Sequence, residues 1–138
     1  MSDVLLNFNQ FKSEDPPSTM KVQGEVVIKT LSENDCVFNT PLYLMQFKNK
    51  SHTFWRKCSG GVIFLVLKGN CMIRTKDSVL RVLNAGELIR IKPNEEHFFG
   101  AASNEETSVL TILTNLPNND VTYLNEVTPK DLLGLEEI

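Results

Sequence analysis

The sequence predicts an all-β protein in one domain, either a sandwich or a barrel. Short stretches rich in β-branched and aromatic residues recur along the chain, with Gly, Asn, Asp, Ser and Pro between them. Turn residues at intervals of about 8–12 residues are typical of such folds. The 138 residues are enough for one domain with a buried core, and the apolar (41%) and charged (22%) fractions are those of an ordinary globular protein.

The stretch from Val62 to Gly69 is the most apolar part of the chain and is expected to be its central strand. Successive side chains of a strand point to opposite faces. The two resulting sets are Val62, Phe64 and Val66 on one face, and Ile63, Leu65 and Leu67 on the other. Since both sets are apolar, the strand must be covered on both sides. We expect a domain core on one side and a second covering surface on the other.

The other strands are expected on either side of this one. They are Val22 to Thr30, Leu42 to Lys48, Cys71 to Thr75, Val79 to Leu83, Glu87 to Lys92, His97 to Ala101 and Ser108 to Leu113. Polar or glycine-containing segments separate them, including a loop over residues 49–61 and a tight turn at Gly69. Residues 1–20 precede the first strand as an arm, in which Pro16 and Pro17 break any helix because proline lacks a backbone N–H.

The C-terminal segment carries the one helical pattern. Thr128 can cap a helix, Pro129 suits its first position, and Asp131 follows three residues after the cap. Leu132, Leu133 and Leu135 give this helix an apolar side. The chain is therefore divided into an N-terminal arm (1–20), a β domain (21–127) and a C-terminal helical tail (128–138).

Charge and cysteine content exclude several classes of function. The formal net charge of −3 disfavours a general attraction to nucleic acid, which is not expected to be the direct partner. No apolar run approaches the ~20 residues that span a bilayer, and the N-terminal residues lack the features of a secretory signal. The three cysteines have no C-x-x-C spacing, which argues against a disulfide framework and fits a reducing compartment such as the cytosol or nucleus.

Two stretches resemble the motifs of the cupin superfamily. The segment Gly86 to His97 is similar to the second cupin motif, in which a glycine, a later proline and a histidine have this spacing. Aligning the last glycine of the first motif on Gly69 puts Val62 at its glutamate, and Trp55 and Lys57 at its two histidines. The resemblance covers about residues 40 to 115. It implies a cupin-like double-stranded β-helix, or jelly roll, followed here by the short C-terminal helix.

Within that superfamily, the chain is most similar to the dimerisation domains that end centromere protein C and its yeast counterpart. The shared features are the apolar strand Val62 to Leu67, the Gly-Glu-x-Ile-x-Ile-x-Pro-like segment from Gly86, and the last strand Ser108 to Leu113. The resemblance implies a homodimer at the end of a kinetochore scaffold, located in the nucleus at the centromere. The chain departs from these domains in retaining His97, and it lacks the flanking motif that binds centromeric nucleosomes.

The residues favour neither a metal site nor a catalytic one. A divalent metal needs three or four converging nitrogen or carboxylate ligands, and the chain has two histidines in all, His52 and His97. Val62 offers no carboxylate where the cupin motif has one. Cys58 lies beside two cations, but no histidine is clearly placed as its base, so a solvent-side thiol is expected. We therefore expect no metal, no cofactor and no catalytic residues, and hence no enzyme.

Two surfaces are predicted to bind proteins. The loop residues Phe54, Trp55 and Arg56 are of the types enriched in interaction hot spots; the alternative is that Trp55 plugs the mouth of the barrel. The predicted dimer interface is the outward apolar set: Ile63, Leu65, Leu67, Leu110 and Ile112. A patch of this kind is not left bare on a monomer, although the arm or the C-terminal helix could cover it within the same chain.

The predicted function is therefore a metal-free module for homodimerisation and partner binding, most like that of a centromere or kinetochore scaffold. The competing class is a small cupin enzyme or a small-ligand binder that uses the barrel interior.

Overall fold

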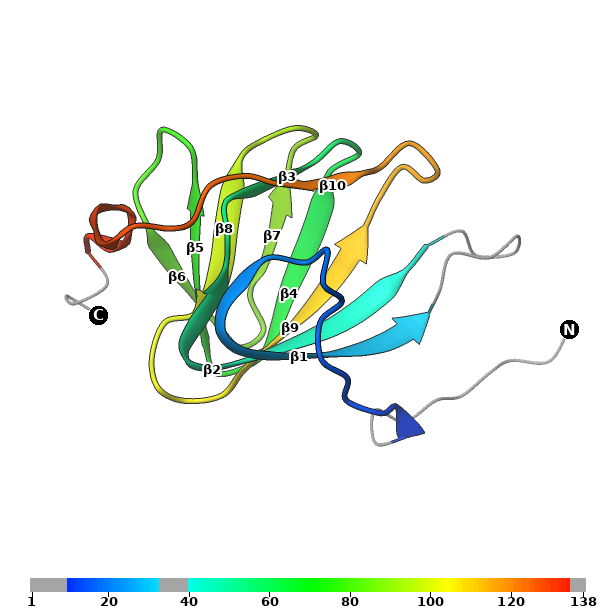
Figure 1. Ribbon diagram of the computed structural model, residues 1–138, viewed down its shortest axis with the longest axis horizontal. Coiled ribbons are helices and arrows are strands. Elements are labelled where there is room, and N and C mark those ends of the chain that lie inside the picture. Colours follow the sequence, from blue (N-terminus) through cyan, green and yellow to red (C-terminus); the bar gives the residue numbers. More distant parts are fainter. Residues whose placement is uncertain (1–9, 33–39, 135–138) are drawn as a thin grey trace, which may run out of the picture.

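The computed structural model describes residues 10–32 and 40–134, which form an antiparallel β-sandwich closed almost into a barrel (Figure 1). The strands in these residues are β1 (Val22–Ser32), β2 (Leu42–Thr53), β3 (Arg56–Cys58), β4 (Val62–Lys68), β5 (Asn70–Thr75), β6 (Arg81–Asn84), β7 (Leu88–Ile91), β8 (His97–Ala101), β9 (Thr107–Leu113) and β10 (Val121–Tyr123). The predicted all-β class is confirmed.

The strands form two layers that share β2. The first sheet has the order β1-β2-β9-β4-β7, and the second has the order β6-β5-β8-β3-β10. Near its end, β2 leaves the first sheet and pairs with β8 of the second, where His52 faces Gly100. Neighbours in the sheets are mostly distant in sequence, as in a jelly roll.

The bend in β2 corrects the prediction of a polar break after Lys48. Asn49 and Lys50 have positive φ angles of 52° and 60°, yet the strand continues to Thr53. On β1 the register shifts at Gly24, where φ is 99° and an added Cβ would collide with Ser51. Such a bulge bends both strands at one place, so the polar residues turn β2 toward the second sheet. The predicted loop over residues 49–61 is wrong to this extent, and it also contains β3.

The tight turn between β4 and β5 is confirmed and depends on Gly69. Its φ is +77°, and a Cβ built there would lie 2.6 Å from the carbonyl oxygen of Glu106. Only glycine combines this backbone conformation with so close an approach.

Two elements differ from the sequence prediction. The strand expected from Val79 begins at Arg81, and Val79 itself is 77% exposed. β10 was not expected: it has three residues and pairs with β3, which places Val121 opposite Cys58. A strand this short has no alternation long enough to detect.

The C-terminal helix is reduced to a 3-10 turn, Pro129–Leu132. The predicted capping box is present, because the Thr128 and Asp131 side chains each bond the other's backbone N–H. Leu133 leaves helical geometry and Gly134 has a φ of +102°, which end the element after one turn. No helix in the described part of the chain is long and apolar enough to cross a membrane.

The arm touches the first sheet at its edge. The backbone N–H and carbonyl of Glu14 bond those of Ile28 at 2.8 Å, which extends the sheet beyond β1 by one bridge. Phe11 is half-buried. Leu5 and Phe8, which the sequence suggested as docking residues of the arm, lie outside the described residues, and the division at residues 20 and 127 stays a prediction.

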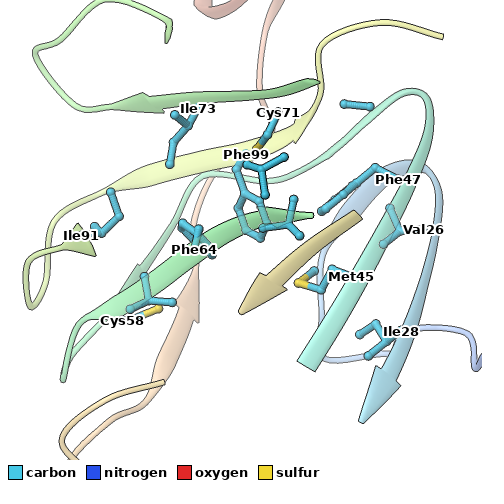
Figure 2. Close-up of a cluster of buried hydrophobic side chains, with 14 residues drawn as sticks. Val26, Ile28, Met45, Phe47, Cys58, Phe64, Cys71, Ile73, Ile91 and Phe99 are labelled. Carbon is cyan, nitrogen blue, oxygen red and sulfur yellow. The ribbon is translucent and has the colours of Figure 1, made fainter. Parts of the chain in front are cut away.

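The core lies between the two sheets (Figure 2). Val62, Phe64 and Val66 are fully buried there, so the predicted inward face of the central strand is confirmed. The Phe99 ring of β8 packs against Phe64 at 4.1 Å and against Phe47 at 5.3 Å between centroids. Aromatic contacts therefore join the first sheet to the second.

Candidate functional site

A buried arginine and histidine form the polar centre of the barrel. Arg56 of β3 and His97 of β8 are cross-strand partners whose side chains point inward. The Arg56 Nε–H donates to His97 Nε2 at 3.1 Å. His97 Nδ1 lies 2.9 Å from the carbonyl oxygen of Glu95, which can only accept. Both contacts are satisfied when the imidazole is neutral and carries its proton on Nδ1.

Burial lowers the pKa of His97 to about 3, and the positive charge of Arg56 adds to this effect, while the bond to the Glu95 carbonyl acts in the opposite direction. At neutral pH the imidazole is therefore uncharged. Its Nε2 lone pair is already engaged by the Arg56 guanidinium.

These residues do not fit a divalent metal. The expected alignment of Trp55 and Lys57 with the cupin histidines is wrong, because Arg56 and Cys58 are the β3 residues that point into the barrel. A guanidinium beside His97 repels a cation from the one inward imidazole. In residues 10–32 and 40–134 no three histidine, cysteine or carboxylate groups lie together as a ligand set.

The guanidinium of Arg56 keeps unused donors. It lies over the rings of Phe99 and Phe64, 4.9 and 5.5 Å from their centroids, and its Nη1 donates to the Tyr123 hydroxyl at 3.4 Å. Its Nη2 has no hydrogen-bond partner, and the same holds for the buried Thr111 hydroxyl. No carboxylate of the described residues forms an ion pair with Arg56. A buried cation without a counter-charge is costly.

This arginine lines a cavity of about 420 Å³ between the sheets. The buried lining residues include Arg56, Thr111, Met45 and Ile28, whereas the lining residues Glu14 and Asp15 are exposed. The first group therefore marks the floor of the cavity, and the arm residues mark its mouth.

The buried cysteines offer no nucleophile. Burial raises the pKa of Cys58, although the charge of Arg56 acts in the opposite direction. Cys58 is not the solvent-side thiol that the sequence suggested, because its side chain belongs to the core. Burial also raises the pKa of Cys71, to about 12. Both thiols are therefore protonated at neutral pH.

The predicted partner-binding residues do not share one exposed surface. Phe54 is half-buried, Trp55 packs on the outer face of the second sheet, and Arg56 is only 2% exposed. The Trp55 indole meets the Phe98 ring edge to face at 4.9 Å, and its Nε1–H donates to Asp131 at 3.1 Å. The predicted exposure of Arg56 and the alternative that Trp55 plugs the barrel mouth are both wrong.

Trp55 instead holds the C-terminal segment against the second sheet. Its backbone N–H and carbonyl bond Asn125 and Leu124 at 3.0 and 2.6 Å. The residues buried or packed there are Met72, Phe98, Ala102, Val127, Leu80, Val82 and Leu132. The outer face of this sheet is therefore covered by residues of the same chain.

The outer face of the first sheet carries a broad apolar surface. One cross-strand row is Arg90, Ile63, Ile112 and Leu42, and the next is Leu88, Leu65, Leu110, Leu44 and Lys29. We call the seven apolar members of these rows the apolar face: Leu42, Leu44, Ile63, Leu65, Leu88, Leu110 and Ile112. Figure 1 shows the strands that carry them, β2, β9, β4 and β7, side by side. Leu88 is 55% exposed, and the others except Leu44 are half-buried.

Four of the five predicted interface residues belong to this apolar face. Leu67 is 37% exposed at the end of β4, where a register shift interrupts pairing with β9. Leu42, Leu44 and Leu88 were not among the predicted interface residues, although Leu42 and Leu44 alternate along the predicted strand in β2.

No protein-family model and no curated protein matches this sequence. A cupin-like protein of Thermotoga maritima shares 27% identity, with 94% of each chain covered and a TM-score of 0.80. A predicted oxalate decarboxylase of the same organism shares 17% identity over 82% of this chain and 100% of its own, with a TM-score of 0.73.

A third similar structure is Drosophila melanogaster CENP-C, solved bound to CAL1. It shares 15% identity, with 80% of this chain and 85% of that chain covered and a TM-score of 0.62. At this identity the likeness concerns the fold alone. The jelly roll implied by the sequence motifs is thus supported by several solved structures, and the chain has the cupin fold.

Proposed function

We propose that the chain is a homodimerisation module in which the apolar face of one copy packs against the same face of a second copy. The observation that carries this proposal is the unequal cover of the two sheets. The C-terminal segment covers the second sheet, whereas Leu88 and its neighbours on the first sheet remain accessible in the described part of the chain. The alternative places the arm (residues 1–20) or the C-terminal helix over this face. Residues 1–9 of the arm lie outside the described part, and Leu132 of the C-terminal turn packs against the second sheet instead.

The apolar face crosses four strands of the first sheet. Its rows run across β7, β4, β9 and β2, with Arg90 and Lys29 at opposite ends. A two-fold axis uses one self-complementary patch on both copies. A stable interface needs about 800 Å² from each partner, and at about 25 cal/mol per Å² a largely apolar patch of that size offsets the usual cost of association.

The cellular role that we propose is that of a centromere or kinetochore scaffold, acting in the nucleus. Support comes from the sequence resemblance to centromere protein C dimerisation domains and from the similar structure of CENP-C bound to CAL1. In this proposal the dimer also presents a site for a protein partner. Phe54 remains a candidate for that site, since it is not fully buried.

A non-enzymatic role is part of the same proposal. The competing function is that of an enzyme. The observation that favours it is the similar structure of a predicted oxalate decarboxylase. The described residues favour the binding module, because His97 is bonded to Arg56 and both buried cysteines are held protonated.

The proposal is tested by placing a carboxylate on the apolar face. Leu65→Glu and Leu88→Glu should each weaken the dimer by at least about 100-fold, because a dimer would bury two unpaired carboxylates. The molar mass at micromolar concentration should fall to that of one chain, while circular dichroism stays that of the folded protein. Leu88 tolerates the change best in a single chain, since it is the more exposed.

Val79→Glu is the matched control. Val79 is also an exposed aliphatic residue, but it lies before β6 of the second sheet. The Val79→Glu substitution should leave the molar mass in solution equal to that of the wild type. A folded Leu88→Glu variant that keeps the wild-type mass would show that another face, or none, joins the copies.

A further inference from the structure

The cavity around Arg56 has the composition of a site for an anion with an apolar body. Its floor holds a guanidinium that is 2% exposed, lacks a carboxylate partner among the described residues and has an unpartnered Nη2. The Thr111 hydroxyl on the same floor also lacks a partner. Unpartnered buried donors are costly and uncommon in native structures.

Arg56 has enough free N–H groups to bind both oxygens of a carboxylate. Of the five N–H groups of a guanidinium, one is used on His97 and one on Tyr123. The remaining N–H groups lie on Nη1 and Nη2, the pair that binds the two oxygens of a carboxylate side by side. Because the rings of Phe64 and Phe99 lie against the guanidinium, the donor pair is held in a fixed orientation.

The other lining residues determine which chemical group can accompany the carboxylate of the ligand. The side chains of Ile28, Met45, Leu113 and Val121 are apolar, and the cavity of about 420 Å³ is within the range of small-molecule pockets. At the mouth, Glu14 and Asp15 add negative charge. A second carboxylate on the ligand would be repelled there.

From these observations we infer that the barrel interior binds a small organic monocarboxylate, held at its carboxylate by Arg56 and along its chain by the apolar walls. The Thr111 hydroxyl supplies an additional donor to the same carboxylate. The site does not depend on dimerisation, since its lining is formed by residues of one chain.

The test uses three probes of one length: hexanoate, hexanamide and adipate. By titration calorimetry on the purified full chain, hexanoate should bind with a Kd of about 1 mM or tighter. Hexanamide lacks the charge and adipate carries a second one, so each should bind at least about tenfold more weakly. In heteronuclear NMR, hexanoate should also shift the buried Nε–H resonance of Arg56.

The matched variants are Arg56→Met and Arg90→Met. Both remove one arginine, but Arg90 is exposed on the outer side of β7 and should leave hexanoate binding unchanged. Arg56→Met should lose at least about tenfold in affinity. If this variant does not fold, Thr111→Val serves in its place, with a loss of about threefold to tenfold expected.

Three results would overturn the inference. They are the absence of hexanoate binding to the wild-type chain, equal binding of hexanamide, and a loss of affinity in Arg90→Met as large as in Arg56→Met. Equal binding of the amide would mean that the cavity takes apolar molecules without using its guanidinium.

Discussion

At the residue scale, the Arg56–His97 pair makes stability depend on the protonation of one imidazole. His97 Nε2 accepts from Arg56 and Nδ1 donates to Glu95. Protonation of Nε2 would remove the acceptor of the Arg56 N–H, because two N–H donors would then face each other in a buried site. This conflict is the structural counterpart of the lowered pKa of His97, to which burial contributes most.

We predict that the protein loses stability as the pH falls below about 6.5, the ordinary pKa of histidine. The unfolded chain then binds a proton that the folded chain binds only near pH 3. The contribution of His97 is therefore complete above pH 6.5 and is lost progressively toward pH 3, by at most about 1.4 kcal/mol per pH unit. Urea unfolding of the wild type and of His97→Gln, compared from pH 7.5 to 4.5, measures it.

His97→Gln is the informative variant because glutamine can accept from Arg56 and donate to Glu95 without titrating. Its free energy of unfolding should change less with pH than that of the wild type. Parallel pH profiles for the two proteins would contradict the assignment of a neutral, buried His97.

The direction of each β3 side chain could not be predicted from the sequence. Side chains alternate, so Trp55 shares one face with Lys57, and Arg56 shares the other with Cys58. Each face therefore has one apolar and one cationic residue. Because neither face is clearly the more apolar, the pattern does not show which of them points into the core. The structure resolves this through contacts distant in sequence, since Phe98 and Asp131 hold Trp55 outside while His97 and Tyr123 hold Arg56 inside.

At the scale of elements, Asn119 joins two connections that no sequence pattern links. Its Oδ1 accepts from the Gly60 N–H at 3.0 Å, and its Nδ2 donates to the Gly61 and Thr114 carbonyls at 2.7 and 2.8 Å. The side chain is buried. It therefore fixes the turn before β4 to the segment between β9 and β10.

We predict that Asn119→Asp destabilises the protein by about 2–4 kcal/mol. The change replaces a donor with an oxygen facing two carbonyls and leaves those buried acceptors unpaired. Chemical unfolding measures the loss. The neighbouring Asn118→Asp is the control, because Asn118 is exposed and should change stability by less than about 0.5 kcal/mol. A similar small effect for both variants would contradict the proposed role of Asn119 in joining these two segments.

The strands that consist of β-branched or aromatic runs between turn residues were predictable, and the shortest or context-dependent ones were not. β4, β5, β8 and β9 have the bounds expected from the sequence to within a residue. β3 and β10 have three residues each and pair with each other in the second sheet. The capping residues Thr128 and Asp131 were recognised, but a cap starts a helix without setting its length, and Gly134 ends this one after a single turn.

At the scale of the whole molecule, the two outer faces of the sandwich differ in how far other residues of the chain cover them. One is covered by the C-terminal segment through Trp55 and its neighbours, and the other presents the apolar face. Alternation in the central strand could predict the second face, because Ile63 and Leu65 had to point away from a buried Phe64. It could not predict the cavity, whose lining comes from the arm and from both sheets.

The most direct test of the proposed dimer is the molar mass of the wild-type chain in solution. Sedimentation equilibrium at micromolar concentration should give about 31 kDa, twice the chain mass of 15.6 kDa. It should fall toward 15.6 kDa only in variants of the apolar face. A wild-type mass of 15.6 kDa up to about 100 μM would contradict the proposal that this face joins two copies.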